Sequence, residues 1–198
     1  MFYEADKPHG LPHNPFKALV APRPIGWVST KSKAGVFNLA PYSFFSAIGD
    51  NPPMVAISSS GYKDTVANID ATGEFVCNMA TYDLAQAMNQ SSRMVEESVS
   101  EFDLGRVTPV PGQMIEVPRV REAKAALECK SLSVQRLVDL EGSETNQWLI
   151  LGQVVGIHID DSVLKNGLVD TSKLGLLSRL GYMDYAVIKD VFTLDRPV

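Results

Sequence analysis

The sequence has few cysteines and no histidine cluster. Cys77 and Cys129 are its only cysteines, and their spacing matches no paired-cysteine metal or redox motif, so we expect buried free thiols. His9 and His13 are four residues apart, but the prolines and the glycine around them argue against a shared helix face. No metal site is therefore expected.

Long apolar runs and basic runs are also missing. No apolar stretch approaches the roughly 20 residues that a membrane-spanning helix needs, and the N-terminus lacks the charged-then-apolar pattern of a secretory signal. The formal net charge is −5, and no basic run could neutralise several backbone phosphates. We expect a cytoplasmic protein with neither a membrane nor a nucleic-acid partner.

What the sequence does contain is typical of a β protein. A length of 198 residues predicts a single domain, residues 1–198. Apolar runs and period-2 alternation predict strands at residues 25–30, 35–40, 54–58, 74–79, 127–140, 147–159 and 185–194. Short loops at 31–35 and 141–146 predict antiparallel hairpins.

Helical periodicity is brief, at 64–71, 82–89 and 163–168, and residues 94–117 are expected to run over the surface. Long strands with short helices favour a closed or nearly closed barrel, because closure removes exposed strand edges. The sequence therefore predicts a mainly β fold, a barrel with short helical decorations.

Residues 58–65 form the first candidate binding segment. An apolar strand ends there in three serines and a glycine, and a helix is predicted to begin at Asp64 or Thr65. A helix N-terminus presents free N–H groups to an anion, and Lys63 adds a positive charge. The alternative is that Asp64 or Thr65 only caps the helix. Neither the glycine-rich dinucleotide fingerprint nor a P-loop is present.

Residues 38–45 form the second candidate segment. Pro41 is expected to interrupt a strand and to free backbone groups that could face a ligand. Asn38 and Ser43 could donate hydrogen bonds to the polar end of a flavin ring. The flat apolar surface could come from Tyr42, Phe44 or Trp27, although any one of these aromatic residues could equally be core.

Several motifs resemble one family in both order and spacing. They are residues 22–30, 38–45, 52–53, 63–65 and 74–78, followed by 127–130, 151–155 and 178–185. Together they resemble the flavin reductase-like proteins over most of the chain. The resemblance implies the FMN-binding split barrel, a Greek-key antiparallel barrel, with FMN, or in some members FAD, at the interface of a homodimer.

The resemblance also implies roles for particular residues. It assigns the flavin phosphate to Ser58, Ser59, Lys63 and Thr65, and the isoalloxazine ring to Asn38, Ala40, Pro41, Tyr42 and Ser43, with Ser29 and Thr30 nearby. Arg179 could reach a flavin or nicotinamide phosphate because its planar fork suits phosphate, or it could form a surface ion pair. Residues 105–109 depart from the family pattern.

The expected activity is that of an NAD(P)H-dependent flavin reductase. NADH or NADPH would give a hydride to flavin N5, and electrons would pass to oxygen, free flavin or a redox protein partner. The cofactor supplies this chemistry, so no catalytic acid or base is predicted. The alternatives are an FMN-carrying electron-transfer protein resembling flavoredoxin, and a barrel that has lost its flavin.

Overall fold

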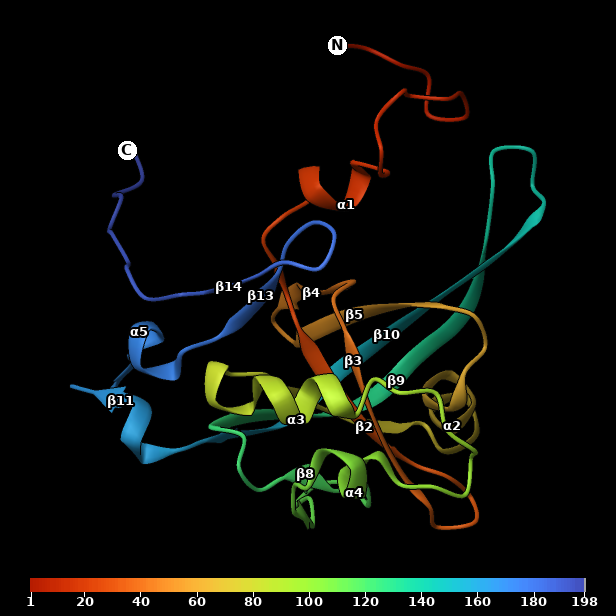
Figure 1. Ribbon diagram of the computed structural model, residues 1–198. Coiled ribbons are helices and arrows are strands. Elements are labelled where there is room, and N and C mark those ends of the chain that lie inside the picture. The colour runs from red at the N-terminus through yellow and green to blue at the C-terminus, as the bar shows by residue number, and fades with distance from the viewer. Residues whose placement is uncertain (198) are drawn as a thin grey trace.

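The computed structural model describes residues 1–197 and is built on one seven-stranded antiparallel sheet (Figure 1). The strand order is β3-β2-β6-β9-β10-β5-β4. These strands are β2 (Gly26–Lys31), β3 (Phe37–Tyr42), β4 (Phe45–Asp50), β5 (Pro53–Ser60), β6 (Glu74–Met79), β9 (Ala125–Val138) and β10 (Glu144–Ile159). Period-2 patterning thus located most of the sheet, and the split-barrel prediction is confirmed.

Shorter elements surround this sheet. Three strand groups are β1 (Arg23–Pro24) with β13 (Leu177–Arg179) and β14 (Tyr185–Val187), β7 (Pro109–Val110) with β8 (Arg119–Val120), and β11 (Leu164–Lys165) with β12 (Leu168–Val169). The helices are α1 (Phe16–Leu19), α2 (Asp64–Thr72), α3 (Ala85–Gln90), α4 (Glu101–Gly105) and α5 (Thr171–Leu174), with 3₁₀ turns η1 (Tyr82–Leu84) and η2 (Asp161–Val163).

Apolar side chains pack on both faces of the sheet. On one face Val28, Ile57 and Ile150 pack with Val66 and Ile69 of α2. On the other face Trp27 and Leu39 pack with Met88 of α3 and Phe102 of α4. Because the two faces of β2 are both covered, Trp27 is fully buried and belongs to the core. It offers no surface to a cofactor.

The edge strands β3 and β4 follow one another in the chain, joined by Ser43 and Phe44. The carbonyl of Phe44 accepts a hydrogen bond from the Ser58 amide at 2.8 Å. A Cβ placed on Gly26 would lie 2.9 Å from the Phe45 ring. The sheet therefore coils so that the start of β4 comes against the start of β2, and Gly26 is required there by space.

Pro41 does not interrupt its strand, contrary to the sequence prediction. β3 runs through it to Tyr42, and Pro41 pairs with Trp27 of β2. An edge strand tolerates proline because a missing N–H there can face away from the sheet.

Two further predictions were wrong, and one strand of the seven-stranded sheet was missed. Residues 163–168 are not helical: η2 ends at Val163, and a hairpin follows in which Asn166 and Gly167 have φ of 53° and 80°. An Asn-Gly pair with positive φ at both positions is the preferred tight hairpin turn. Within 185–194, only Tyr185–Val187 is a strand. β4 was not predicted, and the 94–117 excursion contains α4 and β7.

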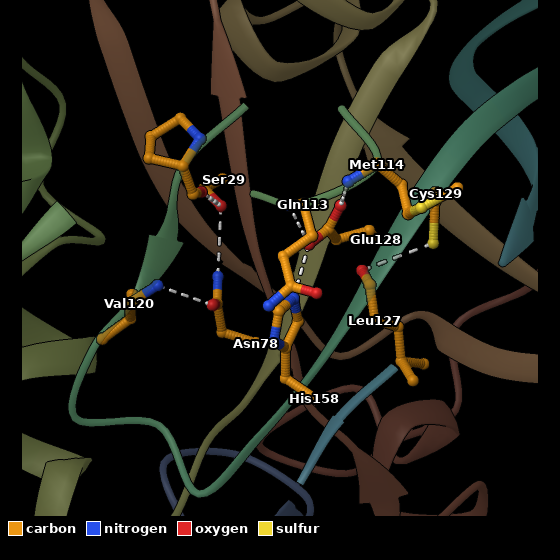
Figure 2. A network of polar contacts seen from close by, with 10 residues as sticks. Ser29, Asn78, Gln113, Met114, Val120, Leu127, Glu128, Cys129 and His158 are labelled. Carbon is orange, nitrogen blue, oxygen red and sulfur yellow. Dashed lines mark hydrogen bonds and ion pairs between the residues drawn. The ribbon is translucent and has the colours of Figure 1, made fainter. Parts of the chain in front are cut away.

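Residues 113–120, the strap, cross the sheet and are held by buried polar side chains (Figure 2). The Glu128 carboxylate accepts the amides of Gln113 at 2.8 Å and Met114 at 2.7 Å and contacts His158 Nε2 at 2.5 Å. Asn78 Oδ1 accepts the Val120 amide at 2.8 Å. Strands β6 and β9 thereby fix the path of the strap.

Candidate functional site

The cavity that contains half of the predicted site residues has a volume of about 330 Å³. It lies between β3, the start of α2 and the segment that follows α3. Its walls are Asn38, Ala40, Pro41, Tyr42, Lys63, Asp64, Thr65, Ser91, Ser92, Arg93, Met94, Val95 and Glu101. We refer to it as the β3–α2 cavity. Six of the twelve predicted residues meet here: Asn38, Ala40, Pro41, Tyr42, Lys63 and Thr65.

The start of α2 presents free backbone donors at this cavity. The helix is nine residues long, and Lys63 occupies the N-cap position with extended backbone and no side-chain cap. Its first intrahelical bond runs from the Ala67 amide to the Lys63 carbonyl, which leaves the amides of residues 64–66 without an intrahelical partner. A helix end of this kind favours an anionic ligand.

A buried network of hydroxyls and amides supports the cavity wall. Asn38 Nδ2 donates to Thr65 Oγ1 at 2.9 Å and to Thr30 Oγ1 at 3.2 Å, and Asn68 Nδ2 donates to Thr30 Oγ1 at 3.0 Å. The Tyr42 hydroxyl lies beside the hydroxyls of Thr65 and Ser59. Burial raises the pKa of Tyr42, so its hydroxyl remains a proton donor at neutral pH. The network fixes the orientation of Thr65 before any ligand arrives.

Charges of both signs line the cavity. Lys63 and Arg93 supply the positive charge, and Asp64 and Glu101 the negative charge. Glu101 is buried, and its carboxylate accepts the Leu39 amide at 3.0 Å. Burial raises the pKa of Glu101, with a further contribution from Asp64. The free amides at the start of α2 add to the positive charge of Lys63 and Arg93, and this end of the cavity favours an anion.

Two predicted hydroxyls lie behind this wall, and four predicted residues lie elsewhere. Thr30 and Ser59 are buried, Thr30 in the network and Ser59 donating to the Gly61 carbonyl at 3.0 Å. Ser43 and Ser58 are half-buried outside the cavity lining. Ser29 faces the strap, where it donates to the Pro118 carbonyl at 2.6 Å.

Arg179, the last of the predicted residues, lines a different cavity. The segment that sequence reasoning missed is residues 91–95, which closes one side of the β3–α2 cavity. Two serines and an arginine, residues 91–93, follow a predicted helix there, and this pattern could have indicated anion binding. The position of the segment depends on tertiary packing, because Ser91 Oγ accepts the Trp27 indole N–H at 2.8 Å.

The cavity fits an FMN phosphate and its ribityl chain. Its hydroxyls, amides and cations gather near α2, while Ala40, Pro41, Met94 and Val95 supply an apolar side. A volume of about 330 Å³ lies at the small end of the range for ligand pockets, roughly 300–1,000 Å³. A single chain therefore accommodates the tail of this cofactor more readily than it encloses the whole flavin ring.

Residues 1–197 contain no group of three or more side chains placed to hold a metal ion. Over the same range, no helix combines the length and the hydrophobicity that crossing a membrane requires.

Comparison with known proteins places the chain in one family. Residues 19–176 match the family model described as the flavin reductase like domain. An uncharacterized protein of Halalkalibacterium halodurans, BH2278, is 36% identical over 185 residues, which cover 90% of this chain and 87% of that protein.

Two crystal structures resemble this chain closely. Nitrilotriacetate monooxygenase component B from Bacillus cereus superposes with a TM-score of 0.84 at 32% identity, covering 90% of each chain. The 2-nitrobenzoate 2-nitroreductase NbaA of Pseudomonas fluorescens superposes with a TM-score of 0.81 at 28% identity, covering 92% of this chain and 88% of that one.

Proposed function

The chain belongs to the flavin reductase like domain family, and from this premise we propose that it is an FMN-binding oxidoreductase whose flavin is reduced by NADH or NADPH. The observation that carries the proposal is the meeting of the uncapped start of α2 with Lys63, Arg93 and the Thr65 hydroxyl in one cavity. Free amides, two cations and an oriented hydroxyl are the groups that bind a phosphate monoester.

Each part of the β3–α2 cavity then has a role in binding FMN. Lys63, Arg93 and the amides of residues 64–66 would hold the phosphate, and Ala40 and Pro41 would lie against the flavin ring. When bound, FMN supplies the hydride-accepting atom N5. The chain itself binds, orients and shields the ring, which requires no catalytic acid or base.

We further propose a homodimer with the flavin at its interface. The support is the volume of the β3–α2 cavity, which leaves much of an FMN ring to be covered by another surface. The reduced flavin would pass electrons to a small acceptor or a redox protein. A cytoplasmic location stays a prediction from the sequence.

FMN titration of the purified apoprotein tests the phosphate assignment. Lys63→Gln removes a cation from the cavity, and Thr65→Val removes the hydroxyl but keeps the side-chain shape; each should weaken FMN binding about tenfold, as expected for loss of one charge-assisted or buried hydrogen bond. Lys33→Gln removes an exposed cation of the β2–β3 turn and is the matched control. Equal affinities in all four proteins would refute the assignment.

Anaerobic addition of NADH or NADPH to the FMN complex tests the activity. Rapid bleaching of the flavin absorption is the expected result, and the faster donor identifies the preferred nucleotide. FMN that stays bound but is reduced by neither donor would instead identify an electron carrier. Titration with FAD in parallel decides between the two flavins.

A further inference from the structure

A second cavity, of about 520 Å³, lies between α3 and the β13–β14 strands. Its lining is Tyr82, Ala85, Gln86, Met88, Asn89, Ser92, Leu177, Arg179, Met183, Tyr185 and Val187. We refer to it as the Arg179 cavity. Ser92 lines this cavity and the β3–α2 cavity as well, so the two are neighbours. Nothing in the proposed binding of FMN accounts for this second cavity.

Among the residues described, 1–197, Arg179 is the only charged side chain in the lining of this cavity. Its guanidinium lies 4.4 Å from the centroid of the Tyr185 ring and donates to the Tyr182 carbonyl at 2.5 Å. Within residues 1–197 no carboxylate lies within 4 Å of the guanidinium, so the surface ion pair considered from the sequence does not form. A guanidinium held by an aromatic ring, without an acidic partner, retains donors for an anion.

The rest of the lining suits a planar apolar group. Met88 and Leu177 are buried and provide an apolar floor, and Val187 adds to it. Tyr82 and Tyr185 are exposed aromatic rings in the wall. Thioethers and aromatic rings both make favourable contacts with a ligand ring.

We propose that the Arg179 cavity binds an aromatic carboxylate, with the acid group on Arg179 and the ring against the apolar floor. The planar fork of an arginine pairs with both oxygens of a carboxylate, which a lysine cannot reproduce. One cation matches the single negative charge of such an acid. A dinucleotide carries more charge, and the cations available for it, Lys63 and Arg93, line the other cavity.

The proposal goes beyond flavin binding and does not depend on it, because the residues that would hold the acid differ from those assigned to FMN. The FMN-binding proposal and the acid-binding proposal can therefore fail separately. Lys63→Gln should lose FMN affinity and keep the affinity for the acid.

Titration of the FMN-free protein with benzoate, followed by amide chemical shifts, is the direct test. Saturable shifts are expected at residues 85–89 and 177–187, and Arg179→Gln should weaken benzoate binding about tenfold or more. Arg179→Lys should restore only part of the affinity, because lysine lacks the planar fork. Arg121→Gln, which removes an exposed arginine outside this cavity, should leave binding unchanged.

Competing ligands and a second variant complete the test. Cyclohexanecarboxylate should bind more weakly than benzoate, and ADP should not displace benzoate. Tyr82→Ser alters an exposed side chain of the cavity wall and should weaken benzoate binding. This variant tests the proposal if Arg179→Gln does not fold. The proposal is overturned if benzoate does not saturate, if its affinity survives both substitutions, or if ADP occupies the cavity instead.

Discussion

Neighbouring hydroxyls on β2 serve opposite faces of the sheet. Thr30 accepts hydrogen bonds from Asn38 and Asn68 behind the β3–α2 cavity, whereas Ser29 donates to Pro118 of the strap. Strand side chains alternate between faces, so adjacent residues cannot share one site. The family resemblance implied that both hydroxyls lie near the flavin, but the strand register decides which face of the sheet each one meets.

Glu101 should make the protein less stable as the pH rises. Burial raises its pKa in the folded state, so the folded protein binds the Glu101 proton more tightly than the unfolded chain does. Stability falls with pH wherever the folded state holds more protons. The loss begins near the ordinary value of 4.5 and is complete above the raised pKa. Glu101→Gln should remove this loss, since the amide oxygen can still accept the Leu39 amide.

Urea unfolding of wild type and Glu101→Gln at a series of pH values from 4 to 8 measures the effect, with the variant gaining relative stability toward pH 8. Glu97→Gln changes an exposed carboxylate of the same segment and should follow wild type. An identical pH dependence in wild type and Glu101→Gln would contradict the prediction.

Among the elements, the strap depends on side chains that belong to strands. Asn78 in β6 and Glu128 in β9 are both fully buried polar residues within apolar strand sequences. Buried polar groups need partners, and theirs are backbone amides of a segment with little regular structure. Polar residues inside otherwise apolar strands are a signal that the sequence carried, but their partners lie 14 to 42 residues away and could not be identified without the fold.

The Glu128 carboxylate should stabilise the strap in its ionised form. Burial opposes its ionisation, but the hydrogen bonds from His158 and from the amides of Gln113 and Met114 outweigh this, and the pKa of Glu128 is lowered. Stabilisation is then present above its ordinary pKa and lost as the pH falls through the lowered value. Glu128→Gln should cost about 2 kcal/mol at pH 7, because hydrogen bonds to a charged acceptor are each worth about 1.5–3 kcal/mol.

Urea unfolding at pH 7 measures that cost, and hydrogen exchange should show reduced protection at the amides of Gln113 and Met114. Glu116→Gln is the matched control within the strap, since its carboxylate is 86% exposed and lies 3.7 Å from Lys31. That change should stay within about 1 kcal/mol. A cost for Glu128→Gln no larger than that of Glu116→Gln would refute a special role for the buried carboxylate.

At the scale of the whole molecule, one end of the β9–β10 hairpin extends beyond the rest of the sheet (Figure 1). β6 pairs only with residues 126–130 of β9, so beyond Ser131 one edge of β9 has no neighbouring strand in residues 1–197. Leu132 and Val138 are exposed on this open stretch. Sequence periodicity predicted both strands, their greater length and their short loop, but it could not show that one edge of β9 stays open, because strand pairing is a property of the assembled sheet.

An open strand edge with exposed apolar side chains is a pairing surface for another chain. The proposed homodimer therefore predicts that sedimentation velocity will give twice the mass of one chain, and that Leu132→Lys will shift the equilibrium toward monomer. A lysine on an edge strand disfavours pairing because its charge would have to be desolvated. Leu140→Lys places the same charge on a fully exposed residue of the hairpin turn, outside the strand, and should leave the dimer intact. A dimer that survives both substitutions would place the interface elsewhere, and a wild-type monomer at micromolar concentration with FMN bound would refute a flavin site shared between two chains.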